Sequence, residues 1–380
     1  MKCKIEEANY QVTNFKDSNK SIQKFLKKIL VSEYFILVLS IVYFIIVALI
    51  VPTMFTLHNI INILSNIWPL LAIAIGQTFI LLLGGIDLSQ TSVISLTSVI
   101  GSMLISKAFN PSKFGKSPLW GWFLKESGGL FSNMPEVVAV VLAIIVMLLI
   151  GYLIGSLNGI MVAKTRIPAF MVTLISQMFF AAVALYITQS QNITGIPETF
   201  SAIGSKGIGM IPYSLIVTVV LLIIAQFILS KTIRGRWIYS TGANIKTAKV
   251  SGVPTIKTTV FVYGFSGLCA AVGSVLYTGR LMMGRPTLGD SMLMDVIGAT
   301  VIGGTSMFGG KGKVVWTLYG VIFYCILSTS LTHLKIDSFT VNIVKGVVII
   351  LAASLDVVRS KIQRQSTTAI SMKKGAEENA

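Results

Sequence analysis

Four polar residues stand in parts of the sequence that are otherwise apolar. Asp87 follows a glycine pair in "GGIDLS", Asn158 lies in "GSLNG", Asp295 opens "DVIGATVIGG" and Lys345 lies in "NIVKGVV". A charged group among apolar residues is costly, so it faces a polar interior, pairs with an opposite charge or caps a helix near an interface. Asp87, Asn158 and Asp295 are therefore candidates to line a polar path through an apolar bundle. The alternatives are a helix cap for Asp87 and a hydrogen bond between helices for Asn158. The sequence names no partner for Lys345.

Sets of residues that could carry out catalysis are absent from the sequence. There is no phosphate-binding Gly-Lys-Ser/Thr loop, no histidine pair at metal-ligand spacing, and no Ser, His and Asp set that the sequence brings together. The run "GGTSMFGGKGK" contains glycines but lacks the spacing of a phosphate-binding loop. We therefore predict no enzymatic activity, no metal site and no cofactor in this chain.

Apolar runs make up most of the chain. Hydrophobic residues account for 54% of its 380 residues and charged residues for 12%, and the mean hydropathy is +0.81. Apolar runs of about 20 residues are typical of transmembrane helices. The sequence thus predicts an all-α, polytopic transmembrane bundle of about ten spans, some of them interrupted. The expected spans are residues 34–53, 63–83, 88–106, 137–160, 168–188, 213–230, 258–279, 295–308, 314–332 and 338–356. The eighth is too short for an untilted crossing.

The net charge of +17 is distributed unevenly along the chain. If residues 1–33 are cytoplasmic, the alternating spans place 22 of the 31 Lys and Arg on the cytoplasmic side. Short cytoplasmic loops of membrane proteins carry an excess of these residues. We therefore predict a multi-pass protein of the cytoplasmic membrane with both termini in the cytoplasm. The basic balance indicates topology and contact with lipid, and no nucleic-acid partner is expected.

Segments between and beyond the spans define the predicted domain organisation. The expected parts are a cytoplasmic tail at 1–33, a transmembrane domain at 34–356 with an extracytoplasmic insert at 107–136 and a cytoplasmic loop at 231–257, and a basic cytoplasmic tail at 357–380. Trp120 and Trp122 of the insert suit the level of the lipid headgroups. Membrane anchoring is expected for the insert, and a lid or a docking surface is the alternative.

Glycine pairs interrupt two of the apolar runs, at Gly84 and Gly85 and at Gly303 and Gly304. Glycine permits tight turns and close approach of backbones, and interrupted helices free backbone groups to line a cavity. Paired interruptions in two halves of a chain point to a translocation pathway. Tight turns and helix packing are the alternative explanation.

The loop 231–257 carries six basic residues and no acid. Within it, Asn244 is suited to begin a helix, "IKTAKV" supplies little more than one turn, and Gly252 is suited to end it. A helix this short is unstable alone in water. We expect it to lie against the membrane surface or against a cytoplasmic partner.

Five segments resemble one known family. In chain order they are "GGIDLS" (84–89), "LNGIMVAKTRIPAFMVTL" (157–174), "GRWIYSTGANIKTAKVSGV" (235–253), "MDVIGATVIGGTSMFGGKG" (294–312) and "IVKGVVIILAASLD" (343–356). Together they resemble the permease subunits of bacterial ABC importers for ribose, xylose, galactose and similar sugars. The resemblance extends over roughly residues 60 to 358.

The resemblance implies partners and a docking element. It implies a second permease copy or a paralogue, an extracytoplasmic sugar-binding protein, and a cytoplasmic ATP-binding cassette ATPase that holds ATP and Mg. It also implies that the loop 231–257 carries the coupling helix that docks into the ATPase. The residues carried over to that docking element are Gly242, Asn244, Ala248, Ser251 and Gly252. Ala243 and Thr247 depart from the family pattern, which affects the fit to a particular ATPase.

The function expected from the resemblance is import of a monosaccharide by alternating access, driven by the partner ATPase. A nucleoside or another small solute is the alternative cargo. A carrier coupled to ions and acting alone is a further alternative, although the sequence offers few ionisable residues for a relay.

Overall fold

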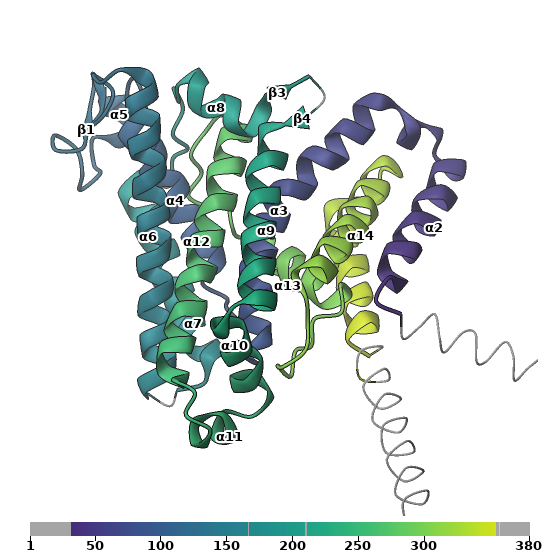
Figure 1. The fold of residues 1–380 in the computed structure, drawn as a ribbon. Coiled ribbons are helices and arrows are strands. Elements are labelled where there is room, and N and C mark those ends of the chain that lie inside the picture. The colour runs from purple at the N-terminus through teal and green to yellow at the C-terminus, as the bar shows by residue number, and fades with distance from the viewer. Residues whose placement is uncertain (1–31, 166, 210, 355–356, 358–380) are drawn as a thin grey trace, which may run out of the picture.

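The computed structural model describes residues 32–165, 167–209, 211–354 and 357. The predicted tails at 1–33 and 357–380 therefore lie outside the described residues, apart from residues 32, 33 and 357, and so does Cys3. Within the described residues, the chain is a bundle of helices with two short hairpins (Figure 1).

Each of the ten predicted spans falls on a helix of the structure, which confirms the predicted fold class. The helices are α2 (Phe35–Ile50), α3 (Leu57–Leu82), α4 (Gln90–Ile105), α6 (Glu136–Thr165), α7 (Ala169–Thr188), α9 (Tyr213–Lys231), α12 (Thr255–Leu281), α13 (Met292–Ile302), α14 (Val314–His333) and the helix Ser338–Ser354. Six of them, α3, α6, α7, α9, α12 and α14, are long and apolar enough to cross a membrane. The other four are shorter apolar helices.

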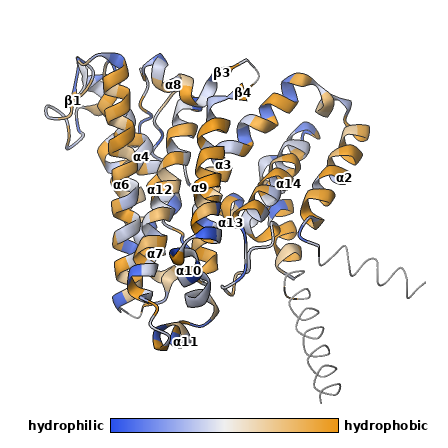
Figure 2. Cartoon of the chain, in the orientation of Figure 1, coloured by the Kyte–Doolittle hydropathy of each residue, from blue (hydrophilic) through white to orange (hydrophobic). Residues whose placement is uncertain are grey.

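Shorter elements gather at the two ends of the bundle (Figure 1). One end, which we call the α11 end, holds α10 (Ile233–Ala243) and α11 (Ile245–Val250). The opposite end, the α8 end, holds α8 (Glu198–Ser205) and the other short elements. These are η1 (Pro52–Phe55), α5 (Pro111–Phe114), β1 (Leu124–Lys125), β2 (Gly128–Gly129), β3 (Gly207–Ile208) and β4 (Ile211–Pro212). Figure 2 shows apolar residues along the long helices and polar residues mainly in these connections.

The insert 107–136 contains α5 and the antiparallel β1–β2 hairpin. Trp122 near the hairpin is 81% exposed, whereas Trp120 packs against the core. The exposed ring is available to a lipid headgroup layer or to a protein, so anchoring by this insert stays a prediction.

Two groups of helices differ in their burial. Nearly all residues of α4 are buried, as are most residues of α3 and α12, so these three form the centre of the bundle. Large apolar side chains of α2, α6, α7, α9 and Ser338–Ser354 are exposed, which is the pattern of helices that face lipid. The bundle therefore has a centre rich in Ser, Thr and Gly inside an apolar ring.

The connection between α12 and α13 is non-helical and lies against α4. The Arg285 N–H donates to the Ser98 hydroxyl at 3.3 Å, and the Gly289 N–H donates to the Ser95 hydroxyl at 3.0 Å. Irregular backbone at membrane depth needs such partners, because lipid offers none. The Ser95 and Ser98 hydroxyls thus supply acceptors for backbone N–H groups of the connection, which can therefore lie beside α4 without being helical.

The short helix α13 differs in its bounds from the predicted span 295–308. It starts at Met292 and ends at Ile302, because Gly303 and Gly304 end it. Its 11 residues span about 16 Å, well short of the roughly 30 Å of a bilayer core. The segment is too short for an untilted crossing, as predicted, but its predicted C-terminal end is wrong.

Three glycines spaced by four residues hold α6 close to α12. In the sequence they read "GYLIGSLNG", with Gly151, Gly155 and Gly159 on one face of α6. A Cβ at Gly155 would lie 2.2 Å from the Tyr263 carbonyl oxygen of α12. Small residues at this spacing let helix backbones approach in membranes.

Replacing Gly155 by alanine is therefore expected to destabilise the bundle by about 1–3 kcal/mol through overpacking. Gly346 is the matched control, since it is also helical but a Cβ there would meet nothing within 4 Å. Gly346→Ala is expected to be neutral or to stabilise by up to about 1 kcal/mol. Thermal unfolding in detergent measures both, and equal stability of the two variants would contradict close α6–α12 packing.

Candidate functional site

The short helix α11 has the ends that the sequence predicts. The Asn244 side-chain oxygen accepts a hydrogen bond from the Thr247 N–H at 3.0 Å. At the other end Gly252 has a φ of +80°, which favours glycine, and the Val253 N–H donates to the Ala248 carbonyl at 3.0 Å. The predicted N-cap, length and stop of this helix are confirmed.

The predicted docking residues of this segment do not all face outward. Ala248 is only 4% exposed and Gly242 is partly buried, whereas Asn244, Ser251 and Gly252 are exposed. The outer surface of α11 also presents Ile245, Lys246, Lys249 and Val250, and Val250 is 90% exposed. Two of the five predicted docking residues, Gly242 and Ala248, therefore pack against the rest of this chain.

The three glycine-containing segments 84–85, 242 and 303–312 meet at the α11 end, and we call their contact the glycine junction (Gly84, Gly242, Gly309 and Gly310). The Gly310 N–H donates to the Leu82 carbonyl at the end of α3, at 2.9 Å. A Cβ at Gly242 would lie 1.7 Å from the same carbonyl oxygen, and one at Gly309 would lie 2.6 Å from the Gly242 carbonyl oxygen. The junction therefore joins the ends of α3 and α10 and the loop after α13 by backbone contact.

The predicted helix-break glycines lie at the ends of α3 and α13. Gly84 and Gly304 have φ values of +76° and +105°, a region that side chains disfavour, while Gly85 and Gly303 continue the turns. The Tyr239 hydroxyl of α10 donates to the Gly312 carbonyl at 2.7 Å. Gly84 lies beside the loop that follows the second interruption, since a Cβ at Gly309 would lie 3.0 Å from the Gly84 nitrogen.

Asp87 and Asn158 belong to one buried polar cluster. One Asp87 oxygen accepts from the Ser89 hydroxyl at 2.6 Å and from the Ser89 N–H at 3.0 Å, and the other accepts from the Ser266 hydroxyl at 2.9 Å. The Asn158 amide donates to the Ser89 hydroxyl at 2.8 Å. This cluster braces the start of α4 against α6 and α12. A pathway role for Asp87 and Asn158 stays a prediction.

Asp295 lies apart from that cluster and pairs with Lys345. The Lys345 ammonium is 3.1 Å and 3.4 Å from the two carboxylate oxygens, and the Tyr324 hydroxyl donates to the same carboxylate. The ammonium also lies 5.1 Å from the centre of the Tyr324 ring. The ion pair joins α13 to the helix Ser338–Ser354, and the Tyr324 hydrogen bond adds α14. Lys345 thus has a carboxylate partner, which the sequence could not name.

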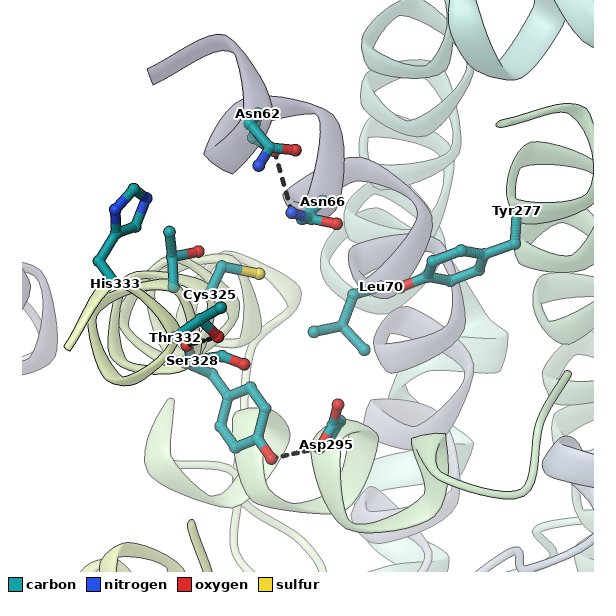
Figure 3. A pocket seen from close by; sticks show the side chains of 11 residues that line it. Asn62, Asn66, Leu70, Tyr277, Asp295, Cys325, Ser328, Thr332 and His333 are labelled. Carbon is teal, nitrogen blue, oxygen red and sulfur yellow. Dashed lines mark hydrogen bonds between the residues drawn. The ribbon is translucent and has the colours of Figure 1, made fainter. Parts of the chain in front are cut away.

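A cavity of about 270 Å³ opens beside Asp295 (Figure 3). Its wall is mostly polar. Side chains that contribute to the wall include Asn62, Asn66, Tyr277, Ser328, Thr329 and Thr332. Behind Asn62 and Asn66, the Arg280 guanidinium donates to both carboxamide oxygens and to the Ser65 carbonyl. The start of α3 and the end of α14 form much of the wall, so the cavity lies toward the α8 end.

Comparison with known proteins identifies the family. A family model described as the permease component of branched-chain amino acid transport systems matches residues 59–353. The chain belongs to this permease family. The matched part of the permease includes the glycine junction, α11, Asp87, Asp295 and Lys345.

Curated relatives match the permease over most of their length. The ribose import permease protein RbsC of Bacillus subtilis is 35% identical over 82% of this chain and 88% of its own. The RbsC protein of Haemophilus influenzae is 32% identical over the same shares. The L-arabinose transport system permease protein AraH of Escherichia coli is 28% identical over 87% of this chain and 92% of its own. No solved structure matches the permease.

Sequence reasoning missed two features of the permease. Tyr324 and Lys345 complete the Asp295 site, but they come from other helices, and nothing local in the sequence links them to Asp295. The close α6–α12 contact was missed although its signal, three glycines at four-residue spacing, is present in the sequence.

Proposed function

We propose that the permease is the membrane subunit of an ATP-driven importer of a pentose such as ribose or arabinose. The observation that carries the proposal is the match to ribose and arabinose permeases over more than four fifths of this chain. The chemistry of ATP hydrolysis is assigned to a partner ATPase that holds ATP and Mg. An extracytoplasmic sugar-binding protein and a second permease copy, or a paralogue, complete the importer.

The α11 end is proposed to face the cytoplasm, with both termini on that side. The excess of Lys and Arg in the loops at this end supports the assignment. The ATPase would then meet the outer face of α11. Val250 and Ile245 offer apolar contact there, flanked by Lys246 and Lys249, while the buried Ala248 keeps the helix in place.

The glycine junction supplies a mechanical link from α11 to the bundle. A helix of this length moves as a rigid body when its partner closes, and close backbone contacts pass such a movement on with little loss. Movement of α10 would shift the end of α3 and the loop after α13 together, because Gly242 lies against Leu82 and Gly309. We infer that this shift exchanges the outward-open and inward-open states.

Competition for uptake tests the proposed cargo. Cells that express the complete importer are expected to take up labelled ribose or arabinose, and an excess of unlabelled pentose is expected to abolish the signal. Branched-chain amino acids are the critical competitors, since the matching family model is named for them. Inhibition by leucine or by a nucleoside, without inhibition by any pentose, would assign a different cargo.

A further inference from the structure

The cavity beside Asp295 presents polar atoms that have no partner among the described residues. Among the described residues, no hydrogen bond is made by the Tyr277 hydroxyl, the Ser328 hydroxyl, the Thr329 hydroxyl or the Asn62 side-chain nitrogen. Within the part of the chain that the structure describes, none of these four atoms is fully buried, so each is reached by solvent and can bond to water or to a polar ligand. Four such groups around one space indicate a wall built for water or for a polar ligand.

The floor of the cavity adds a carboxylate held in a fixed orientation. Lys345 and Tyr324 both bind Asp295, yet the Asp295 side chain remains 26% exposed. A carboxylate accepts hydrogen bonds from hydroxyl groups, and bonds to a charged group are stronger than neutral ones. Lys345 therefore neutralises the charge of the Asp295 carboxylate and leaves part of this carboxylate free to accept hydrogen bonds from a ligand in the cavity.

The size and polarity of the space select a ligand class. A volume of about 270 Å³ has room for several water molecules, or for a small ligand in their place. The wall combines hydroxyl and amide groups with Asp295, and it also includes Leu70, Cys325 and His333. The carboxylate favours a neutral ligand with several hydroxyl groups over an anion. A branched aliphatic side chain would leave the hydroxyls of Tyr277, Ser328 and Thr329 unpaired.

We propose that this cavity binds the sugar within a single protomer during its passage, with hydroxyl groups of the sugar bonded to Tyr277, Ser328 and Asp295. The inference rests on the proposed function, because it takes the cargo to be a pentose. In the proposed orientation, the cavity lies on the extracytoplasmic half of the bundle, where it receives the sugar before the α11 end opens. The permease then contributes to sugar selection as well as the binding protein.

The test uses the complete importer in proteoliposomes and compares ribose with deoxyribose analogues. Tyr277→Phe and Ser328→Ala each remove one hydroxyl and little volume. Each is expected to lower the rate of ribose uptake about fivefold to tenfold, the usual effect of losing one or two hydrogen bonds. Each is also expected to shrink the preference for ribose over the analogue that lacks the matching hydroxyl. A purely structural role would not change that ratio.

Blocking the cavity supplies a second variant. Ser328→Leu is expected to reduce uptake at least tenfold while the affinity of the sugar-binding protein is unchanged. Ser354→Leu is the matched control, since Ser354 is exposed at the end of the last helix and lies outside the cavity. Its uptake is expected to equal that of the unmodified importer.

The outcomes separate this inference from the proposed function. If the unmodified importer moves no pentose, the proposed function fails. If it moves pentose and the Tyr277, Ser328→Ala and Ser328→Leu variants all keep the original rate and sugar preference, the cavity is not a sugar site. If Ser328→Leu does not insert into the membrane, the ribose-to-deoxyribose ratios of the two conservative variants decide.

Discussion

Replacing Lys345 by methionine is expected to destabilise the permease by about 1–3 kcal/mol, because it leaves the partly buried Asp295 carboxylate without its cation. Lys345 is 8% exposed and lies 3.1 Å from Asp295. Its loss leaves the Asp295 carboxylate with the Tyr324 hydroxyl as its remaining donor among the described residues. Thermal unfolding of the purified variant in detergent measures the effect.

Two further variants make this prediction specific. Asp295→Asn combined with Lys345→Met removes both charges, and it is expected to recover most of the lost stability. Lys206→Met breaks the exposed pair with Glu198, whose side chain is 79% exposed, so its expected cost is below about 1 kcal/mol. A Lys345→Met variant as stable as Lys206→Met would show that the Asp295 pair does not hold the three helices together.

Gly242→Ala is expected to uncouple the permease from its ATPase. A Cβ at this position would lie 1.7 Å from the Leu82 carbonyl oxygen, so α10 must move away from the end of α3. We expect a stability loss of about 1–3 kcal/mol by overpacking. Uptake of the sugar is expected to fall below about a tenth of the original rate, since this variant also opens the glycine junction. Uptake and ATP hydrolysis measured on the same proteoliposomes show whether hydrolysis continues without uptake, and thermal unfolding in detergent measures the stability loss.

Gly252→Asn is the control for this variant. Gly252 also belongs to the predicted docking element and has a φ of +80°, but a Cβ there would meet nothing within 4 Å. Asparagine tolerates this backbone region better than most residues, so a small effect is expected. If Gly242→Ala transports as well as Gly252→Asn, the glycine junction does not carry the coupling movement.

Local sequence signals predicted most of the fold. Apolar runs located the ten apolar helices of the described residues, because a helix inside a membrane must be apolar over most of its length. Asn244 and Gly252 located α11 within its loop, since the capping groups of a helix are close to it in sequence. Gly303 and Gly304 also carried the signal that ends α13, but the apolar residues beyond them extended the predicted span too far.

Contacts between distant segments could not be predicted from one sequence. Asp295 and Lys345 were both conspicuous as charges in apolar runs, yet their pairing depends on how Ser338–Ser354 packs against α13. The buried position of Ala248 likewise depends on the packing of α10 and α11 on the bundle. Sequence reasoning placed Ala248 on the docking surface, whereas the structure gives the exposed positions to its neighbours Ile245, Lys249 and Val250.

The energy source of uptake tests the central claim most directly. Proteoliposomes that contain the permease, its ATPase and the sugar-binding protein are supplied with labelled pentose, and ATP or an ion gradient is provided separately. We predict accumulation of the pentose with ATP and Mg on the α11 side, and none with a proton or sodium gradient alone. Accumulation driven by an ion gradient in vesicles without the ATPase would contradict the account and favour a carrier that acts alone.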